Sequence, residues 1–356
     1  MRRSVTLRGP SDILAGAAGK TGDGHGCVHW DFSPTRARPA PGMSRTPDID
    51  PAAAKQAIID YCLRKGAMVA GVADLAAIER IAPAGHRPTD LMPRVKSVIA
   101  VAVGGATAGA WRVPAKALGY FGSTESRAYK IVYGLAFFIE HKFGVPAIYC
   151  PPDMDPELGA RYPLQSLKLH AELAGLGARS LAGDILLHPD YGYMYYASCF
   201  TELALPPDKP LAENPCPAPS CVAMFRRDGR TPCMKFCPAQ CLSGEIGADG
   251  KQAAMHYDMA ACAELTQQFE TVPQLLRDAI ATDNPEEREA LLLGERNKVL
   301  WYRMTVGNGG LFAQCFECMR VCPIATNAPL ADPLKRGAAQ RAAASRKVQH
   351  GGADAA

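Results

Sequence analysis

The stretch CFECMRVCP, residues 315–323, places three cysteines and a proline in the spacing C-x2-C-x3-C-P. A second stretch, NPCPAPSCVAMFRRDGRTPCMKFCPAQC at residues 214–241, has the same ending in Cys233, Cys237 and Pro238. A [4Fe–4S] cluster is held by four thiolates, and in two-cluster ferredoxins the cysteine before the proline binds the other cluster. The two stretches therefore predict two clusters, each completed by one thiolate from the far motif.

This exchange assigns a ligand set to each cluster. The first set takes three cysteines from the near motif and one from the far motif, namely Cys216, Cys221, Cys233 and Cys322. The second set takes Cys315 and Cys318 from the far motif, Cys237 from the near motif, and a fourth cysteine. Cys262, in YDMAACAEL, is the candidate for the last place, and Cys241 is its rival.

The spacing of the first set is irregular. It reads C-x4-C-x11-C where a regular motif has C-x2-C-x2-C, so the inserted loop either leaves ligation intact or costs the protein a cluster. Structural zinc also takes four cysteines, but the repeated C-x3-C-P ending favours iron. The remaining cysteines, Cys27, Cys62, Cys150 and Cys199, are expected to have no metal role, and the last three to be small buried hydrophobes.

Composition narrows the class of protein. The chain has 356 residues, 48% of them apolar and 21% charged, with a net charge of +4. This charge is small and scattered, so nucleic acid other than tRNA is not an expected partner. Thirteen cysteines in so long a chain favour metal chemistry in a reducing compartment over a disulfide framework. No run approaches the ~20 apolar residues of a membrane helix, and we expect a cytoplasmic protein.

Patterning along the chain predicts four parts. Residues 1–47 and 331–356 are expected to be disordered, with Met43 as an alternative start. Residues 48–210 alternate helical and strand patterns, which is typical of an α/β domain. Residues 211–330 are expected to form a ferredoxin-type domain with two [4Fe–4S] clusters.

Individual elements are also predicted. Asp50 and Pro51 start a helix that ends at Gly66. The other expected elements are a buried strand over 95–105, a helix from 126 that stops at Gly144, a short strand at 145–150, a helix over 162–177, a strand over 192–205 and helix over much of 263–304.

The sequence resembles the epoxyqueuosine reductases and the corrinoid-dependent reductive dehalogenases over roughly residues 50–328. RPTDLMPRVKSVIAVAV at 87–103, AELAGLGARSLAGDILLHPDYGYMYYASCFTELALPPDKP at 171–210 and the order of the cysteines carry this resemblance. It implies a nitroreductase-like, cobalamin-type α/β domain followed by a ferredoxin-type domain. Two [4Fe–4S] clusters would pass electrons to cobalamin, which would remove oxygen or halogen from an organic or nucleoside substrate.

The resemblance also suggests corrinoid-binding residues. In LGARSLAGD they are Gly177, Arg179, Ser180 and Gly183, although the tryptophan and lysine of the family pattern are missing. The two glycines would permit a close approach to a flat macrocycle, or would simply be a helix stop and a turn. Tyr193, in a strand with alternating tyrosines, is either a platform beside the cofactor or part of a packing face.

The proton donor is another point at which the sequence departs from the family pattern. Where the family has a catalytic aspartate in a segment like G-R-D-Y-H, this chain has GSTESRAYK with Ala128 at that place. Tyr129 and Glu125 are the candidate substitutes, because positioned tyrosine and glutamate act as general acids. The alternative roles are helix packing for Tyr129 and a solvated first turn for Glu125.

Two functions follow as hypotheses. The first is a corrinoid and iron–sulfur reductase of a small molecule or nucleoside, served by an external donor such as ferredoxin or flavodoxin. The second is a corrinoid-free iron–sulfur electron-transfer or accessory protein. The degenerate corrinoid segment favours the second, and the long α/β domain favours the first, since a carrier alone does not need it.

Overall fold

The computed structural model describes residues 49–113, 125–150, 163–183, 185–267, 271–295, 297–298 and 315–327. The expected disordered segments, 1–47 and 331–356, lie outside the described residues, as does Cys27. Within the described part of the chain, no helix has the length and apolar character needed to cross a bilayer.

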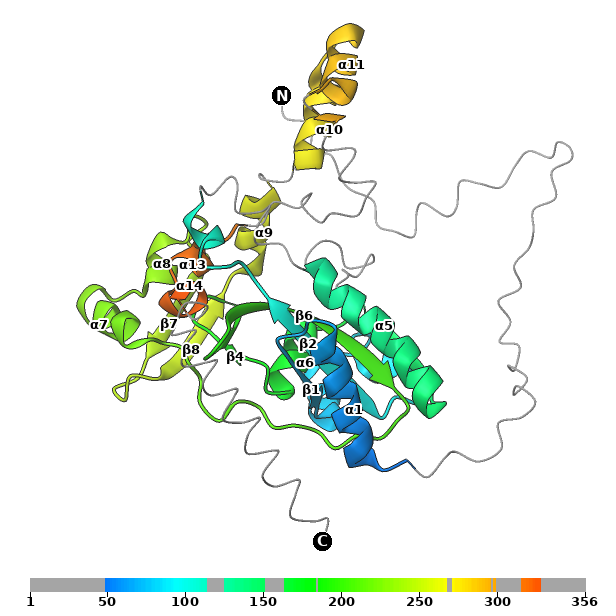
Figure 1. The fold of residues 1–356 in the computed structure, drawn as a ribbon. Coiled ribbons are helices and arrows are strands. Elements are labelled where there is room, and N and C mark those ends of the chain that lie inside the picture. The colour runs from blue at the N-terminus through cyan, green and yellow to red at the C-terminus, as the bar shows by residue number, and fades with distance from the viewer. Residues whose placement is uncertain are drawn as a thin grey trace, which may run out of the picture. The chain divides into compact units, whose positions relative to one another are not determined.

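A six-stranded sheet forms the centre of a mixed α/β fold (Figure 1). Its order is β1-β2-β6-β5-β4. Strand β3 also pairs with β6, at residues 198–201, whereas β5 pairs with β6 at residues 192–193. Every pairing is antiparallel, although helices alternate with strands along the chain. The strands are β1 (Val69–Ala73), β2 (Ser97–Gly104), β3 (Ala147–Cys150), β4 (Ala178–Arg179), β5 (Leu186–His188) and β6 (Gly192–Thr201).

Helices cover both faces of the sheet, so its central strands are buried on both sides. One face carries α1 (Pro51–Arg64) and α5 (Glu125–Phe143), which lie side by side in Figure 1. The other face carries α2 (Leu75–Ile81), α3 (Pro88–Leu91) and α6 (Leu167–Leu173).

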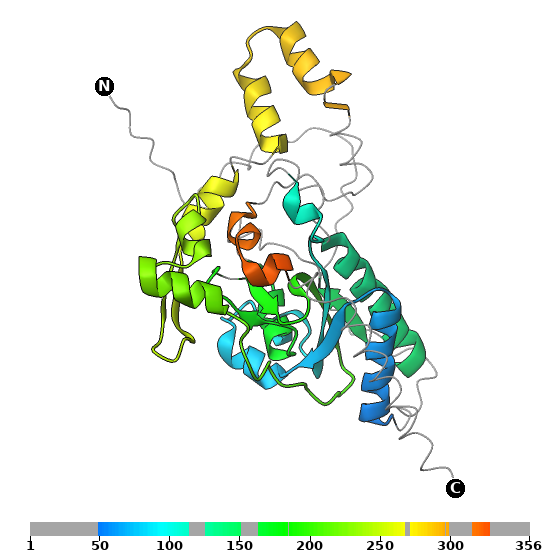
Figure 2. The ribbon, with the colours of Figure 1, turned by 60° about the vertical axis from the view of Figure 1, so that its left-hand side comes forward.

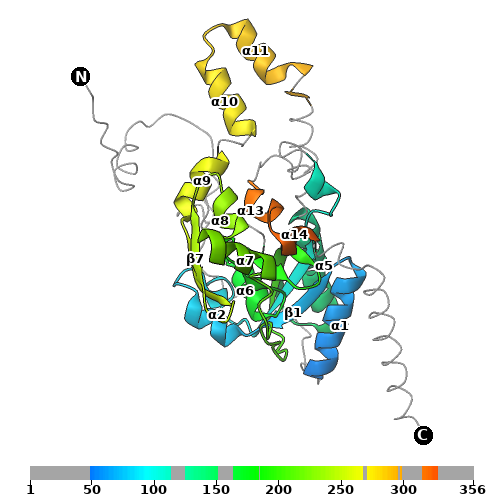
Figure 3. The same ribbon diagram turned by 90° about the vertical axis from the view of Figure 1, so that its left-hand side faces the viewer.

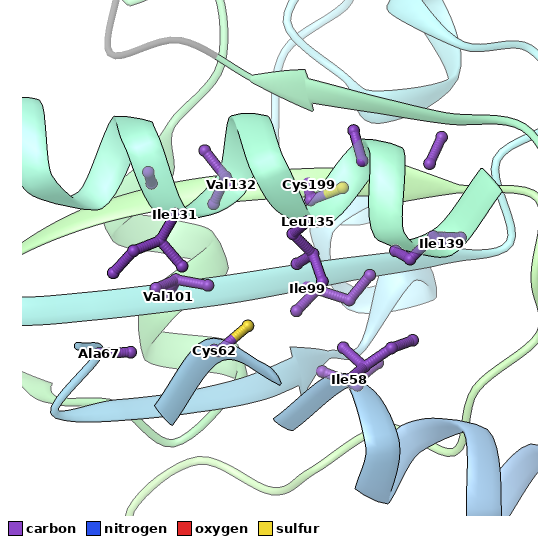
Figure 4. Close-up of a cluster of buried hydrophobic side chains, with 14 of the residues drawn as sticks. Ile58, Cys62, Ala67, Ile99, Val101, Ile131, Val132, Leu135, Ile139 and Cys199 are labelled. Carbon is purple, nitrogen blue, oxygen red and sulfur yellow. The ribbon is translucent and has the colours of Figure 1, made fainter. Parts of the chain in front are cut away.

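Strand β2 supplies both hydrophobic cores because successive side chains of a strand point to opposite faces. Ile99 and Val101 pack with α1 and α5, as Figure 4 shows. Val98 and Ala100 pack with α2 and α6 in the second core. The expected buried strand over 95–105 is therefore confirmed, with a run of β-branched residues explaining its place in the middle of the sheet.

Local signals explain where the helices begin and end. The Asp50 carboxylate caps α1 by accepting from the Ala52 N–H at 2.9 Å. Gly144, with a positive φ of 65°, follows the last residue of α5. Helix α6 is shorter than expected, because Ser166 is its N-cap and the helix ends before Gly175.

The cysteine-rich part packs around short helices. Helices α8 and α13 come from the two distant motifs and contact each other (Figures 2 and 3). Among the described residues after 262, the expected long helical stretch is interrupted, and its helix α11 (Pro285–Leu293) starts at an Asn284 cap. Besides η2 (Ala110–Arg112), which follows β2, the remaining elements belong to the second half of the chain. They are α7 (Pro219–Asp228), α8 (Pro232–Phe236), β7 (Leu242–Ile246), β8 (Gln252–Tyr257), α9 (Met259–Gln267), α10 (Thr271–Ala281), α11 (Pro285–Leu293), α13 (Glu317–Arg320) and α14 (Pro323–Asn327).

Candidate functional site

Four cysteines from the two motifs line one small cavity. Cys216 precedes α7, Cys221 lies in its first turn, and Cys233 lies in α8. Cys322, which joins α13 to α14, completes the group. The structure thus brings together the four cysteines that the sequence assigns to the first cluster, across the irregular spacing of the near motif.

Hydrogen-bond donors point at the sulfurs of this group. The Leu181 N–H donates to Cys216 Sγ at 3.4 Å, and the Ala325 N–H to Cys322 Sγ at 3.5 Å. Thr231 Oγ1 lies 3.1 Å from Cys233 Sγ. Donors to sulfur favour the thiolate form, which is the form that binds metal.

Burial acts in the opposite direction on the same thiols. It raises the pKa of Cys216 to about 12 and that of Cys322 to about 11, because a thiolate loses solvation in apolar surroundings. Mutual repulsion adds to the effect, since Cys221 and Cys233 raise the pKa of both. A soft cationic group between the sulfurs would remove this penalty.

A second cavity, of about 200 Å³, is lined by five cysteines. Its walls also include Tyr193, Lys168 and Tyr257. The five are Cys237, Cys241, Cys262, Cys315 and Cys318. Both rivals for the last ligand place are therefore present, and the group holds one thiol more than the four that a cluster takes.

Among the four residue types that most often bind metals in proteins, which are cysteine, histidine, aspartate and glutamate, cysteine alone lines the two cavities. No histidine, aspartate or glutamate is among the residues that line either one. No three potential ligands among the described residues converge closely enough to hold a single metal ion. The first group supplies four thiols and the second five, and a [4Fe–4S] cluster takes four.

The predicted corrinoid residues are mostly engaged within the protein. Arg179 Nε lies 2.9 Å from Glu172 Oε2, and Ser180 is only 1% exposed. A Cβ at Gly177 would stand 3.0 Å from Leu186 Cβ and from Tyr196 Oη. These contacts explain the residue types without a macrocycle.

Gly183 and Tyr193 complete the predicted corrinoid set. Gly183 has a φ of +74°, and a Cβ there would stand 3.0 Å from side-chain atoms of Leu242 and Tyr257. Tyr193 is the member of the set that lines the larger cavity, where its ring packs on Tyr195 at 5.0 Å. The role of the predicted set toward a corrinoid stays a prediction.

The proton-donor candidates do not line either cavity. The half-buried Tyr129 packs edge-to-face on Tyr149 of β3, with ring centroids 5.5 Å apart. Ala128 is fully buried in the same helix. Glu125 is the first residue of α5, and its side chain lies outside the described part of the chain. The catalytic roles of Tyr129 and Glu125 stay predictions.

Trp111 is a neighbour of the second motif that the sequence did not reveal. It lies in η2, is 5% exposed, and packs edge-on against Phe316 at 6.1 Å and Tyr193 at 6.4 Å. Arg320 adds a second link by donating to the Val113 carbonyl at 3.3 Å. A tryptophan among small residues after a buried strand is the only signal that sequence offered.

Comparison with known proteins gives structural matches but no sequence match. No protein-family model matches the chain, and no curated protein matches it. A selenomethionine-labelled epoxyqueuosine reductase is similar at 18% identity and a TM-score of 0.43, covering 78% of this chain and 66% of that one. The epoxyqueuosine reductase of Bacillus subtilis is similar at 17% identity and a TM-score of 0.44, covering 78% of this chain and 66% of that one.

Two further similar structures are a reductive dehalogenase and an epoxyqueuosine reductase with bound RNA. The catabolic reductive dehalogenase NpRdhA is similar at 16% identity and a TM-score of 0.43, covering 75% of this chain and 38% of that one. An epoxyqueuosine reductase solved with a tRNA-Tyr stem loop is similar at 19% identity and a TM-score of 0.39, covering 56% of this chain and 56% of that one. The chain thus spans 56% to 66% of the length of these three epoxyqueuosine reductases. The similar structures belong to the two groups of reductases that the sequence resembles.

Proposed function

We propose that the chain is an iron–sulfur oxidoreductase of the reductase type that carries two [4Fe–4S] clusters. The observation that supports this most is the exchange of cysteines between motifs. Cys322 of the far motif joins the first group of thiols, and Cys237 of the near motif joins the second. This is the arrangement of a two-cluster ferredoxin, and a zinc site has no need of it.

Each group of cysteines would hold one cluster. Cys216, Cys221, Cys233 and Cys322 would hold one cluster, and Cys237, Cys262, Cys315 and Cys318 the other. Bound clusters would accept and donate single electrons. The backbone N–H groups of Leu181 and Ala325 would stabilise the thiolate form of the first set.

The resemblance extends the proposal to a corrinoid acceptor and to removal of oxygen or halogen from an organic or nucleoside substrate. A tRNA carrying such a nucleoside is included, together with an external donor such as ferredoxin or flavodoxin. Gly177, Arg179, Ser180 and Gly183 make contacts within the protein, and their role toward a corrinoid stays a prediction. We assign no step to a corrinoid. A corrinoid-free electron-transfer protein is the second candidate, because the LGARSLAGD segment lacks the tryptophan and lysine of the family pattern.

Metal analysis of anaerobically purified protein supplied with cobalamin tests both levels of the proposal. We expect about eight irons per chain and the absorption of [4Fe–4S] clusters. Bound corrinoid would favour the first candidate, and its absence the second. Iron near zero, or zinc in its place, would overturn the proposal.

Two variants make the test specific to the thiol groups. Cys216→Ala should lower iron to about four per chain, because it removes one ligand of one cluster. Cys62→Ala is the matched control, since Cys62 is fully buried in the α/β core and lines neither cavity. Equal iron loss in both variants would mean that the loss reports misfolding instead of ligation.

A further inference from the structure

Five thiols surround the second cavity, and one of them has to serve another purpose than ligation. We propose that Cys241 is not a ligand there but a thiol that donates its S–H to the ligand Cys237 and thereby raises the reduction potential of the second cluster. This inference rests on the proposed function, and it assigns Cys241 a positioning and tuning role.

The first argument is the distance between two sulfurs. Cys237 Sγ and Cys241 Sγ lie 3.4 Å apart, within hydrogen-bonding range. Two sulfurs on one tetrahedral metal with bonds of about 2.3 Å lie about 3.8 Å apart, and sulfurs on different irons lie further apart still. Cys237 and Cys241 therefore cannot both be ligands where they stand.

The second argument is which thiols face one another. Cys237 and Cys262 are among the groups that act electrostatically on both Cys315 and Cys318. Cys241 is hydrogen-bonded to Cys237, with the two sulfurs 3.4 Å apart. We therefore assign ligation to the other four thiols and the hydrogen-bonding role to Cys241.

The backbone holds Cys241 in this place. Gln240, with a φ of +50°, folds the chain back so that its N–H donates to the Cys237 carbonyl at 3.1 Å. The Cys241 carbonyl accepts from the Asp258 N–H at 2.9 Å, and the Asp258 carbonyl accepts from the Cys262 N–H at 3.2 Å. Cys241 is therefore tied to the segments of both thiols that it contacts, and it is only 6% exposed.

A thiol in this position changes the energetics of reduction. Reduction adds negative charge to a cluster and its thiolates, and a hydrogen bond to a ligand sulfur stabilises that charge. Removing the donor therefore makes reduction harder and lowers the potential. The other cluster should not respond, because Cys241 does not line the first cavity.

The test compares Cys241→Ala, Cys241→Ser and the double variant Cys241→Ala/Cys262→Ala in the full chain, with Cys150→Ala as a buried control. Iron content and redox titration followed by electron paramagnetic resonance are measured for each. We expect Cys241→Ala to keep about eight irons, with one of the two cluster potentials shifted to a more negative value. Cys241→Ser keeps a donor and should restore part of the shift, and the double variant should fall to about four irons.

Three outcomes would contradict the inference or the function beneath it. About four irons in both Cys241→Ala and Cys241→Ser would make Cys241 a ligand and overturn the inference, while the function would stand. About eight irons with unchanged potentials would remove the tuning role. Wild-type protein without iron would instead overturn the proposed function.

Discussion

The Lys55 ammonium lies 2.6 Å from the Asp208 carboxylate and connects α1 to the segment that follows β6. The second oxygen of the same carboxylate accepts from the Val72 N–H at 2.8 Å, and the Asp208 N–H donates to the Val72 carbonyl at 2.7 Å. One side chain thus joins a helix, an edge strand and the chain that leads into the cysteine-rich part.

Asp208→Ala should lower the free energy of unfolding by about 1–3 kcal/mol, because it leaves the backbone N–H of the buried Val72 without its acceptor. Denaturant titration of the two proteins measures this. Glu202→Ala is the control, since its partner Arg94 is 77% exposed and such a pair contributes about 0–1 kcal/mol. Equal losses in the two variants would contradict the role given to Asp208.

His170 should make stability depend on pH. It is fully buried with Nδ1 3.0 Å from Ser198 Oγ, and burial lowers its pKa to about 3. Between an unfolded pKa of about 6.5 and the native value, the unfolded chain binds a proton that the native protein does not. The free energy of unfolding should therefore fall as the pH decreases through this range, by up to about 1.4 kcal/mol per pH unit.

The variant His170→Leu isolates this contribution. Denaturation of both proteins at about pH 7.5 and about pH 5, on either side of the unfolded histidine pKa, should show a smaller pH effect in the variant. His188, whose pKa burial also lowers, remains in both proteins and accounts for part of the residual slope. The same slope in the two proteins would mean that His170 is not buried in its neutral form.

Cys322→Ala tests the exchange of ligands directly. If Cys322 completes the first group of thiols, its variant should lose the same cluster as Cys216→Ala and keep the one that Cys315→Ala loses. Each variant should hold about four irons, and the resonance spectrum of the reduced protein identifies the cluster that remains. A Cys322→Ala spectrum that matches the one of Cys315→Ala would contradict the exchange.

Gly183→Ala should be destabilising through backbone strain and packing together, whether or not a corrinoid is present. An alanine with positive φ costs about 1–3 kcal/mol, and its Cβ would press on Leu242 and Tyr257 at 3.0 Å. Gly229→Ala is the matched control, because Gly229 has a φ of +70° but no atom within 4 Å of its Cβ position. Thermal unfolding without added corrinoid should show a larger loss for Gly183→Ala, and an equal loss would argue against the packing role.

Sequence was sufficient where a signal is local or strongly periodic. The α1 cap at Asp50, the stop of α5 before Gly144 and the buried run of β2 were all predicted, since each depends on neighbouring residues. The first thiol group was also predicted, because the proline after Cys237 and Cys322 indicates which cysteine is exchanged.

Sequence was insufficient where contacts between distant segments decide the outcome. Cys241 and Cys262 remained rivals because both line the second cavity, where Asp258 links them through backbone hydrogen bonds that no local pattern predicts. The packing of Gly183 on Leu242 and Tyr257, and of Trp111 on Phe316, joins residues that no periodicity relates. The antiparallel order of the sheet follows from such contacts too.

The crossing of the motifs has a consequence for synthesis on the ribosome. The first thiol group is incomplete until Cys322 has been translated, and the second is incomplete until Cys315 and Cys318 have been. The other members of both groups are translated much earlier. A nascent chain that has not reached this segment can present only partial sets of sulfurs, which bind metal poorly. Both sites therefore become complete within the same few seconds of elongation, and a protein interrupted before that moment would leave the ribosome without either.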